Sequence, residues 1–250
     1  MEFDTSIRER ARVVSLLGFA ITVTAAGCAG DIVYDEQPIE PDAAPIAPET
    51  CHDWLDHHGV DFDPASETPG VTDPVTVYPP IAGVDYRVSW LDTTRDTLFM
   101  DCRLAQSLVR AGDFFRARDI VEVADMGVYN YRCIGGGDPD TDDCTPSQHA
   151  FALAIDIAGF TTEDGTFLSV LDDWIIDPDD VPTCEAEPEG EANTILHELI
   201  CDLKADDVWN IVLTPNYNAA HRDHFHVDLA EGSDFIRARD DGVDVGGAAH

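Results

Sequence analysis

Three histidines and an aspartate stand close together near the end of the chain, within the run 221–226, which reads His-Arg-Asp-His-Phe-His. Imidazole and carboxylate groups bind divalent metal ions and serve as acids and bases in hydrolysis. Side chains alternate along an extended strand, so His224 and His226 should project to the same side. One of them can then bind a metal ion while the other faces a substrate.

An upstream segment supplies further groups of the same kind. His149 and Asp156 are separated by six residues, most of them apolar. A catalytic zinc ion needs three protein ligands and an open position for water, whose pKa it lowers to about 7. His149, Asp156 and His226 can provide these ligands. Asp223 can reach the reacting water if the backbone bends where the last strand begins.

One plainer interpretation competes with this metal site, and one other zinc-like motif has to be set aside. The histidines could simply cap and pair at the end of a strand, but the combined spacing of the two segments favours ligands. A second motif, His197-Glu198, begins like the zinc motif HExxH, yet Cys201 stands where its second histidine is required. We therefore interpret His197 and Glu198 as ordinary solvated helix residues.

Hydrophobic periodicity predicts the elements that must position these groups. We expect helices over 97–110, ending before Gly112, and over 191–203. We expect strands over 120–124, 150–157 and 208–213, and a last strand that the histidine run opens. In this interpretation His149 and Asp156 bracket a buried strand.

Composition limits the class of protein. The 250 residues are 44% hydrophobic, which is enough for one sizeable domain with a core. The 50 acidic and 14 basic residues give a net charge of −36. Such a surface repels phosphate backbones, so we expect no nucleic-acid partner.

The N-terminus has the features of a bacterial lipoprotein signal peptide over 1–27. Arg8, Arg10 and Arg12 precede an apolar run that ends in Ala-Ala-Gly-Cys, with Cys28 as the residue to be lipidated. A cleaved signal that leaves Cys28 free is the alternative. Ala29 favours the periplasmic face of the outer membrane over inner-membrane retention. The predicted location is the cell envelope, with the membrane as a partner through the lipid.

Four further regions follow from changes in composition. We expect an acidic, proline-rich tether over 28–50, an extension of unassigned role over 51–96, a domain over 97–229 that carries the candidate ligands, and a flexible acidic tail over 230–250. Besides Cys28 there are six cysteines, an even number that predicts up to three disulfides in an oxidising compartment. The sequence does not choose their pairing, although Cys133 and Cys144, which flank a short loop, are one candidate pair.

The pattern SxHxxxxxxD followed by DHxH resembles the zinc D-Ala-D-Ala carboxypeptidases and murein endopeptidases of the lysostaphin-related superfamily. More closely, roughly residues 102–229 resemble the bacterial extensin-like C-terminal domain family. The shared motifs are Tyr-Asn-Tyr-Arg at 129–132, the stretch 149–160, Pro-Asn-Tyr-Asn at 215–218 and the stretch 221–229. Several ordered motifs are more specific than any single one.

The resemblance implies an α+β fold like that of the D-Ala-D-Ala metallopeptidases, with a small antiparallel sheet and flanking helices. It implies Zn²⁺ held by His149, Asp156 and His226, and hydrolysis of peptide bonds in peptidoglycan. Asp223 stands where the carboxypeptidases carry their general base, and His224 matches a histidine that steadies the oxyanion. Some endopeptidase relatives use a histidine as the base, so the choice between these two residues stays open.

Other site assignments are less direct. Arg132 falls where the family often carries an arginine that can bind a substrate carboxylate, although Tyr131 replaces a family cysteine beside it. A surface or core-pairing arginine is the alternative. Ser147 either orients His149 or caps a turn.

The function to weigh against the hydrolase is a non-catalytic metal- or wall-binding envelope lipoprotein. Asp223 and His224 beside the three ligands favour the enzyme, because a structural zinc site needs no general base.

Overall fold

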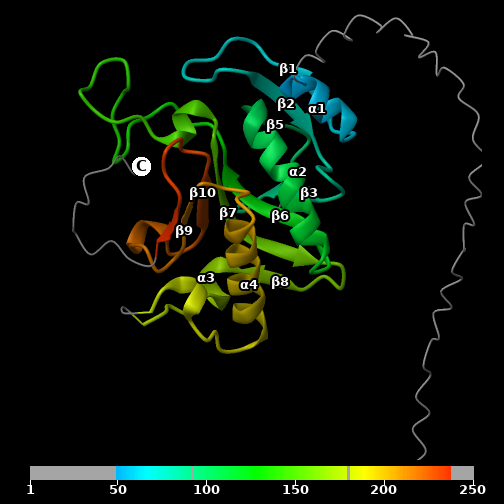
Figure 1. Cartoon of the computed structure of the whole chain (residues 1–250), viewed down its shortest axis with the longest axis vertical. Coiled ribbons are helices and arrows are strands. Elements are labelled where there is room, and N and C mark those ends of the chain that lie inside the picture. Colours follow the sequence, from blue (N-terminus) through cyan, green and yellow to red (C-terminus); the bar gives the residue numbers. More distant parts are fainter. Residues whose placement is uncertain (1–48, 92, 179–180, 238–250) are drawn as a thin grey trace, which may run out of the picture. The chain divides into compact units, whose positions relative to one another are not determined.

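The computed structural model describes residues 49–91, 93–178 and 181–237, which belong to one compact unit. The predicted signal peptide, Cys28 and nearly all of the predicted tether lie outside these residues. In the described ranges no helix is both long and apolar enough to cross a membrane. The arrangement of helices and sheets is that of an α+β protein, as the sequence predicted (Figure 1).

The larger sheet of the described chain carries the residues of interest. Its strand order is β11-β9-β10-β7-β6-β3-β4, with β8 paired to β7. Most neighbours are antiparallel, but β3 with β6 and β9 with β11 are parallel. The bounds are β3 (Asp85–Val88), β4 (Thr93–Thr94), β6 (Ile120–Gly127), β7 (Ala154–Thr162), β8 (Phe167–Ser169), β9 (Ile211–Leu213), β10 (Phe225–Asp228) and β11 (Phe235–Arg237).

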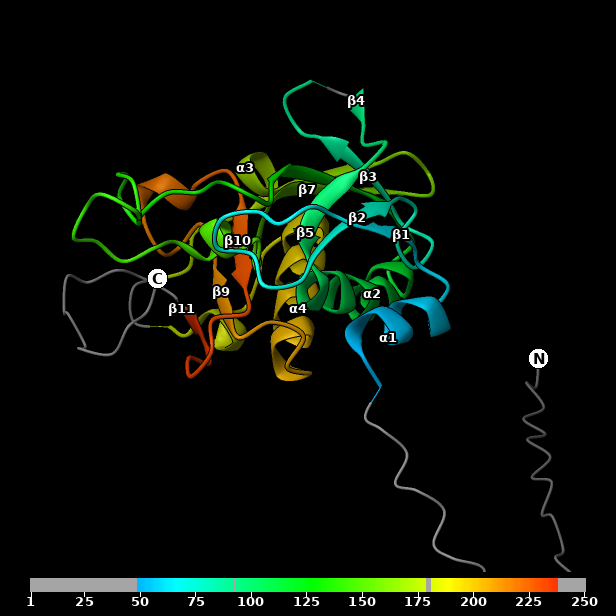
Figure 2. The same cartoon turned by 90° about the horizontal axis from the view of Figure 1, so that it is seen from above.

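A small antiparallel sheet and four α-helices complete the described fold. The sheet consists of β1 (Asp61–Pro64), β2 (Pro74–Tyr78) and β5 (Leu98–Asp101). The helices are α1 (Cys51–His57), α2 (Cys102–Arg116), α3 (Val170–Asp173) and α4 (Glu191–Ala205). Figure 2 shows α2 and α4 on the same side of the larger sheet. Apolar residues of both helices join those of β6 and β7 in one hydrophobic core.

Tertiary pairing moves the predicted first long helix by several residues. The helix expected over 97–110 begins only at Cys102, because residues 98–101 pair with β2 as strand β5. The side chain of Asp101 then caps the helix by accepting a hydrogen bond from the Arg103 amide at 3.1 Å. Gly112 lies inside the helix, where a Cβ would come within 2.6 Å of the Ala82 Cβ. This glycine allows close packing and does not end the helix.

Other predicted elements differ from the structure mainly in their ends. The strand expected over 120–124 is confirmed and extends to Gly127, and the helix expected over 191–203 is confirmed and extends to Ala205. The strand expected over 208–213 is shorter and begins at Ile211.

Two predicted regions are more structured than their composition suggested. Residues 51–96 contribute α1 and β1 to β4, and β2 pairs with β5 of the predicted domain over 97–229. The extension of unassigned role therefore shares a sheet with that domain. Residues 235–237 form β11, which pairs with β9, so the prediction of a flexible tail is wrong for this part. Local composition could not predict the pairing of β2 with β5 or of β9 with β11, because other elements separate the two strands of each pair in the sequence.

The six cysteines of the described chain form three disulfides, as their even number predicted. The bonds join Cys51 to Cys102, Cys133 to Cys144, and Cys184 to Cys201. The candidate pair Cys133–Cys144 is thus confirmed. A native disulfide typically stabilises a fold by about 2 to 4 kcal/mol.

Candidate metal centre

The three predicted ligands meet at one point. His149 Nε2 lies 3.2 Å from Asp156 Oδ1 and 3.1 Å from His226 Nδ1, and these last two atoms are 2.9 Å apart. In the described residues one other group of three has metal-ligand character, but it contains Cys51 and Cys102, which are joined in a disulfide. The cluster of His149, Asp156 and His226 is therefore the candidate metal centre.

Paired strands bring two of the ligands together. Asp156 on β7 and His226 on β10 are direct partners in the antiparallel register, so their side chains lie on the same face of the sheet. The sequence interpretation placed His149 at the start of the same strand as Asp156. In the structure His149 belongs to a 3₁₀ helix, Gln148–Phe151, and β7 begins only at Ala154.

A local turn explains why His149 lies outside β7. The side chain of Ser147 caps the 3₁₀ helix by accepting a hydrogen bond from the His149 amide at 3.3 Å. Ala152, with a φ of 52°, ends it in the left-handed conformation. The chain thus turns back, and the His149 ring reaches the face that carries Asp156. Ser147 fills the turn-capping role that was one of its two predicted alternatives.

Each histidine ligand has its second ring nitrogen fixed. His149 Nδ1 lies 2.7 Å from the Val128 carbonyl oxygen, so Nδ1 donates a proton and Nε2 is left for a ligand. His226 Nε2 lies 3.0 Å from Asp228 Oδ2, so Nε2 donates and Nδ1 is left. Such partners orient metal-binding imidazoles and raise their basicity.

The sequence interpretation missed Asp228, which is buried and also accepts a hydrogen bond from the Ala230 amide at 2.9 Å. A usable signal was present, because residues two apart on a strand share a face and Asp228 follows His226 at that spacing. No comparable signal exists for the Val128 carbonyl, since every residue has one.

The electrostatics of the cluster favour cations. Burial works to raise the pKa of Asp156, but its hydrogen bonds with His149 and His226 outweigh burial and hold the pKa well below the usual value. Burial lowers the pKa of His226, but Asp156 and Asp228 more than reverse this and raise it to about 9. A metal ion at this site would displace the proton from His226 Nδ1.

His224 stands between the ligands and Asp223. Its Nδ1 lies 2.8 Å from Asp223 Oδ1, and its Nε2 lies 3.6 Å from Asp156 Oδ1. Because Asp223 Oδ1 can only accept, the neutral His224 ring carries its proton on Nδ1 and presents the Nε2 lone pair toward the ligands. Asp223 is about half exposed and contacts the opposite side of the ring.

His221 completes a row of imidazoles. Its ring centroid lies 5.1 Å from that of His224 and 6.0 Å from that of His226. Its Nδ1 is 2.8 Å from Asn218 Oδ1, so the loop before β10 holds the ring. Burial, together with the nearby His224 and His226, lowers the pKa of His221 to about 4. His221 is therefore neutral at ordinary pH.

Arg132 lies on the loop that leads to His149. Its carbonyl oxygen accepts a hydrogen bond from the Ser147 amide at 3.0 Å. The side chain is half-buried, and its Nη1 donates to the Cys133 carbonyl at 3.4 Å. Arg132 forms no ion pair with any residue that the structure describes. Its charge is thus available to a carboxylate ligand.

The prediction for His197 is wrong, whereas Glu198 is exposed as expected. His197 is buried, its Nε2 lies 3.0 Å from Asp177 Oδ1, and its ring stacks on Trp174 at 3.7 Å. Trp174 in turn packs edge-on against Phe225 of β10. His197 therefore contacts β10 indirectly, through Trp174. Helical periodicity predicted the helix that carries His197, but it could not predict that the loop of Asp177 covers this side chain.

The fold and this cluster define an α+β protein with a candidate site for a divalent metal ion. The chain belongs to the Extensin-like protein C-terminus family, whose model matches residues 65–238. The match begins within the predicted extension of unassigned role and reaches past β11, in agreement with the single compact unit. No curated protein and no solved structure matches the chain. The more distant resemblance to zinc carboxypeptidases stays a prediction.

Proposed function

We propose that this protein is a zinc-dependent hydrolase that cleaves peptide bonds in peptidoglycan, and that a lipid on Cys28 holds it in the cell envelope. The observation that carries the proposal is the convergence of His149, Asp156 and His226 beside the Asp223–His224 pair. Membership of the extensin-like family supports an envelope role, and three disulfides agree with an exported protein.

The donor set fits zinc. Two imidazole nitrogens and one carboxylate oxygen are a common zinc ligand set, and three protein ligands leave a position open. His149 directs Nε2 toward the candidate centre, because its Nδ1 is bonded to the Val128 carbonyl. His226 directs Nδ1 toward the same place, because its Nε2 is bonded to Asp228, and a metal ion can displace the proton from this Nδ1. When bound, zinc supplies Lewis-acid polarisation and acidifies a water molecule.

We assign proton transfer to His224 and its positioning to Asp223. His224 Nε2 is a free ring nitrogen 3.6 Å from Asp156 Oδ1, so it can accept a proton from the attacking water and return it to the leaving amine. Asp223 holds the ring in the required tautomer and stabilises the imidazolium that forms. The neutral His221 ring beside it adds no competing positive charge.

Arg132 is suited to hold a carboxylate of the substrate. A guanidinium binds a carboxylate through two parallel hydrogen bonds, which fixes orientation as well as affinity. Its carbonyl oxygen accepts a hydrogen bond from the amide of Ser147, the residue that caps the 3₁₀ helix of His149.

Digestion of purified peptidoglycan by the mature protein tests the proposal. The digestion is run with zinc, with a chelator and with zinc restored, and mass spectrometry of the products identifies the bond cut. We expect cleavage that the chelator abolishes and zinc restores. His57→Gln is the matched histidine control, because His57 is exposed on α1. A protein that binds zinc and the wall polymer but never cleaves it would instead be a non-catalytic wall-binding lipoprotein.

A further inference from the structure

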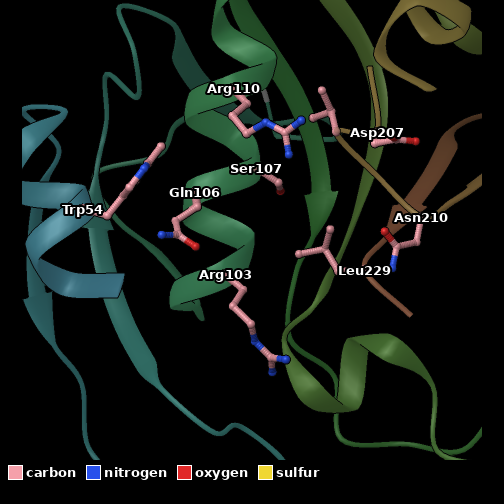
Figure 3. A pocket seen from close by; sticks show the side chains of 9 residues that line it. Trp54, Arg103, Gln106, Ser107, Arg110, Asp207, Asn210 and Leu229 are labelled. Carbon is pink, nitrogen blue, oxygen red and sulfur yellow. The ribbon is translucent and has the colours of Figure 1, made fainter. Parts of the chain in front are cut away.

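A pocket of about 270 Å³ lies over α2, and none of the residues that line it belongs to the metal centre. Arg103, Gln106 and Arg110 form its floor, since their spacing puts them on one face of the helix (Figure 3). Trp54 of α1 stands on one side of this face, and Asn210 stands on the other. The pocket therefore joins three segments that are distant in sequence.

Arg110 brings a positive charge to this pocket, whose lining also includes the carboxylate of Asp207. Its Nη2 donates to the Asp206 carbonyl at 2.8 Å, which fixes the guanidinium plane and leaves the other N–H groups available. It has no carboxylate partner within the described ranges, whereas Arg103 on the same face pairs with Asp101 and Glu231. In a chain with 50 acidic and 14 basic residues, an arginine without such a partner favours an anionic ligand.

The remaining polar groups of the pocket require a ligand rich in hydrogen-bond donors and acceptors. Asp207 lines the pocket, and its carboxylate can only accept hydrogen bonds. Asn210 Nδ2 donates to the Ala230 carbonyl at 2.8 Å, which leaves its amide oxygen as a second acceptor. The side-chain amide of Gln106 has no hydrogen-bond partner among the residues described. Hydroxyl groups satisfy these acceptors, while a carboxylate satisfies Arg110.

Trp54 provides an aromatic wall of fixed orientation. Its ring stacks on His58 with centroids 3.6 Å apart and planes 19° apart, so His58 covers one indole face and only the opposite face can meet a ligand. An indole face packs well against the C–H groups of a sugar ring, and the polar edges of the sugar then remain free for hydrogen bonds. The apolar lining is otherwise small and includes Leu229. This combination suits a sugar better than an apolar peptide side chain.

We infer that this pocket binds a sugar acid, that is, a saccharide unit that carries a carboxylate. Arg110 pairs with the carboxylate, Trp54 covers the ring, and Asp207, Asn210 and Gln106 bind its hydroxyl or amide groups. The inference does not depend on the proposed hydrolase function, because binding here requires neither a metal ion nor a scissile peptide bond.

Isothermal titration calorimetry with peptide-free glycan strands of peptidoglycan, whose sugars carry free carboxylates, tests the inference. The mature protein is titrated as wild type, Arg110→Gln, Trp54→Leu and Arg116→Gln. Arg116 is the matched control, because it lies on the same helix but pairs with Asp113 and does not line the pocket. A second titration uses strands whose carboxylates have been converted to amides, and a third uses a short peptide with a free C-terminal carboxylate.

We expect wild type and Arg116→Gln to bind the strands equally. Arg110→Gln should weaken binding by about tenfold or more, as loss of a charged hydrogen-bond donor does. The amidated strands should lose a similar factor with wild type. Trp54→Leu should also weaken binding, and unchanged circular dichroism excludes unfolding as the cause. Absence of binding to wild type, or equal binding to Arg110→Gln, overturns the inference. Binding of the peptide alone, with loss in Arg110→Gln, assigns the pocket to peptides and refutes the sugar.

Discussion

Asp156 and His226 are 70 residues apart in sequence, yet their Oδ1 and Nδ1 atoms lie 2.9 Å apart across the paired strands β7 and β10. Strand register alone therefore fixes the relative positions of two of the three candidate ligands. His149 joins it from a capped turn, so the third ligand depends on local backbone geometry and not on the register.

The first prediction concerns the ligands. Replacing His149 or His226 by alanine, or Asp156 by asparagine, should lower bound zinc to less than about a tenth of the wild-type stoichiometry, because an incomplete set of three ligands holds zinc weakly. Hydrolysis should fall in parallel. Elemental analysis after dialysis measures the zinc, with His57→Gln as the control. Full zinc content in both His149→Ala and His226→Ala would show that the metal lies elsewhere.

The second prediction separates chemistry from metal binding. His224→Ala should retain zinc and lose about a hundredfold or more in rate, the usual contribution of a positioned acid or base. Asp223→Asn should retain zinc and lose a smaller factor, because His224 remains but its tautomer is no longer imposed. Zinc content, rate and the pH dependence of the rate are measured for both variants. Wild-type rates in both would refute the assigned roles.

The third prediction concerns Asp228, which contacts His226 but does not face the ligand position. Asp228→Asn should weaken zinc binding by about tenfold to a hundredfold, as loss of a partner to a ligating histidine does. Competition with a chromogenic chelator measures the affinity. Asp223→Asn serves as the comparison, because it contacts a histidine that is not a ligand. Equal affinities in the two variants would contradict the role of Asp228.

The fourth prediction is a pH dependence that zinc reverses. The pKa of His226 is raised to about 9, so in chelated protein its contribution to stability should be complete below its unfolded pKa of about 6.5. That contribution should be lost as the pH rises through 9. Zinc requires the deprotonated ring, so its stabilising effect should grow over the same range.

Thermal unfolding at several pH values, with chelator and with zinc, tests this dependence. His226→Gln should flatten the profile of the chelated protein between about pH 6.5 and 9. An unchanged profile in His226→Gln would assign the pH dependence to other groups.

The fifth prediction is the lipid anchor. Cys28→Ser should move the protein from the membrane fraction to the soluble fraction, because a lipidated cysteine supplies the proposed attachment. Fractionation followed by immunoblotting measures the distribution. Full retention of Cys28→Ser in membranes would place the attachment elsewhere.

The sequence predicted the ligand set of the candidate centre more completely than its scaffold. The sequence grouped His149, Asp156 and His226 in one site, and the structure brings their potential ligand atoms together. The predicted elements differ from the structure where a partner distant in sequence determines the local structure. Residues 98–101 became β5 through pairing with β2, and His197 became buried through contact with the loop of Asp177.

The pocket over α2 could not be predicted in the same way. Its residues come from α1, α2 and the loop that carries Asp207 and Asn210, and none of these segments has a motif of its own. Helical spacing placed Arg103 and Arg110 on one face, but the presence of Trp54 beside that face depends on how α1 packs. Only the tertiary structure brings α1 to this position.

The disulfide between Cys51 and Cys102 also determines how the domain bears mechanical force. Cys51 is the first residue of α1, so a pull from the N-terminal side reaches it before any other helix residue. The covalent bond passes this load directly to the start of α2 in the hydrophobic core. The segment between the two cysteines, which includes α1 and the strands β1 to β5, is bypassed. A tension applied through the N-terminus therefore cannot peel these elements away one after another while that bond is intact.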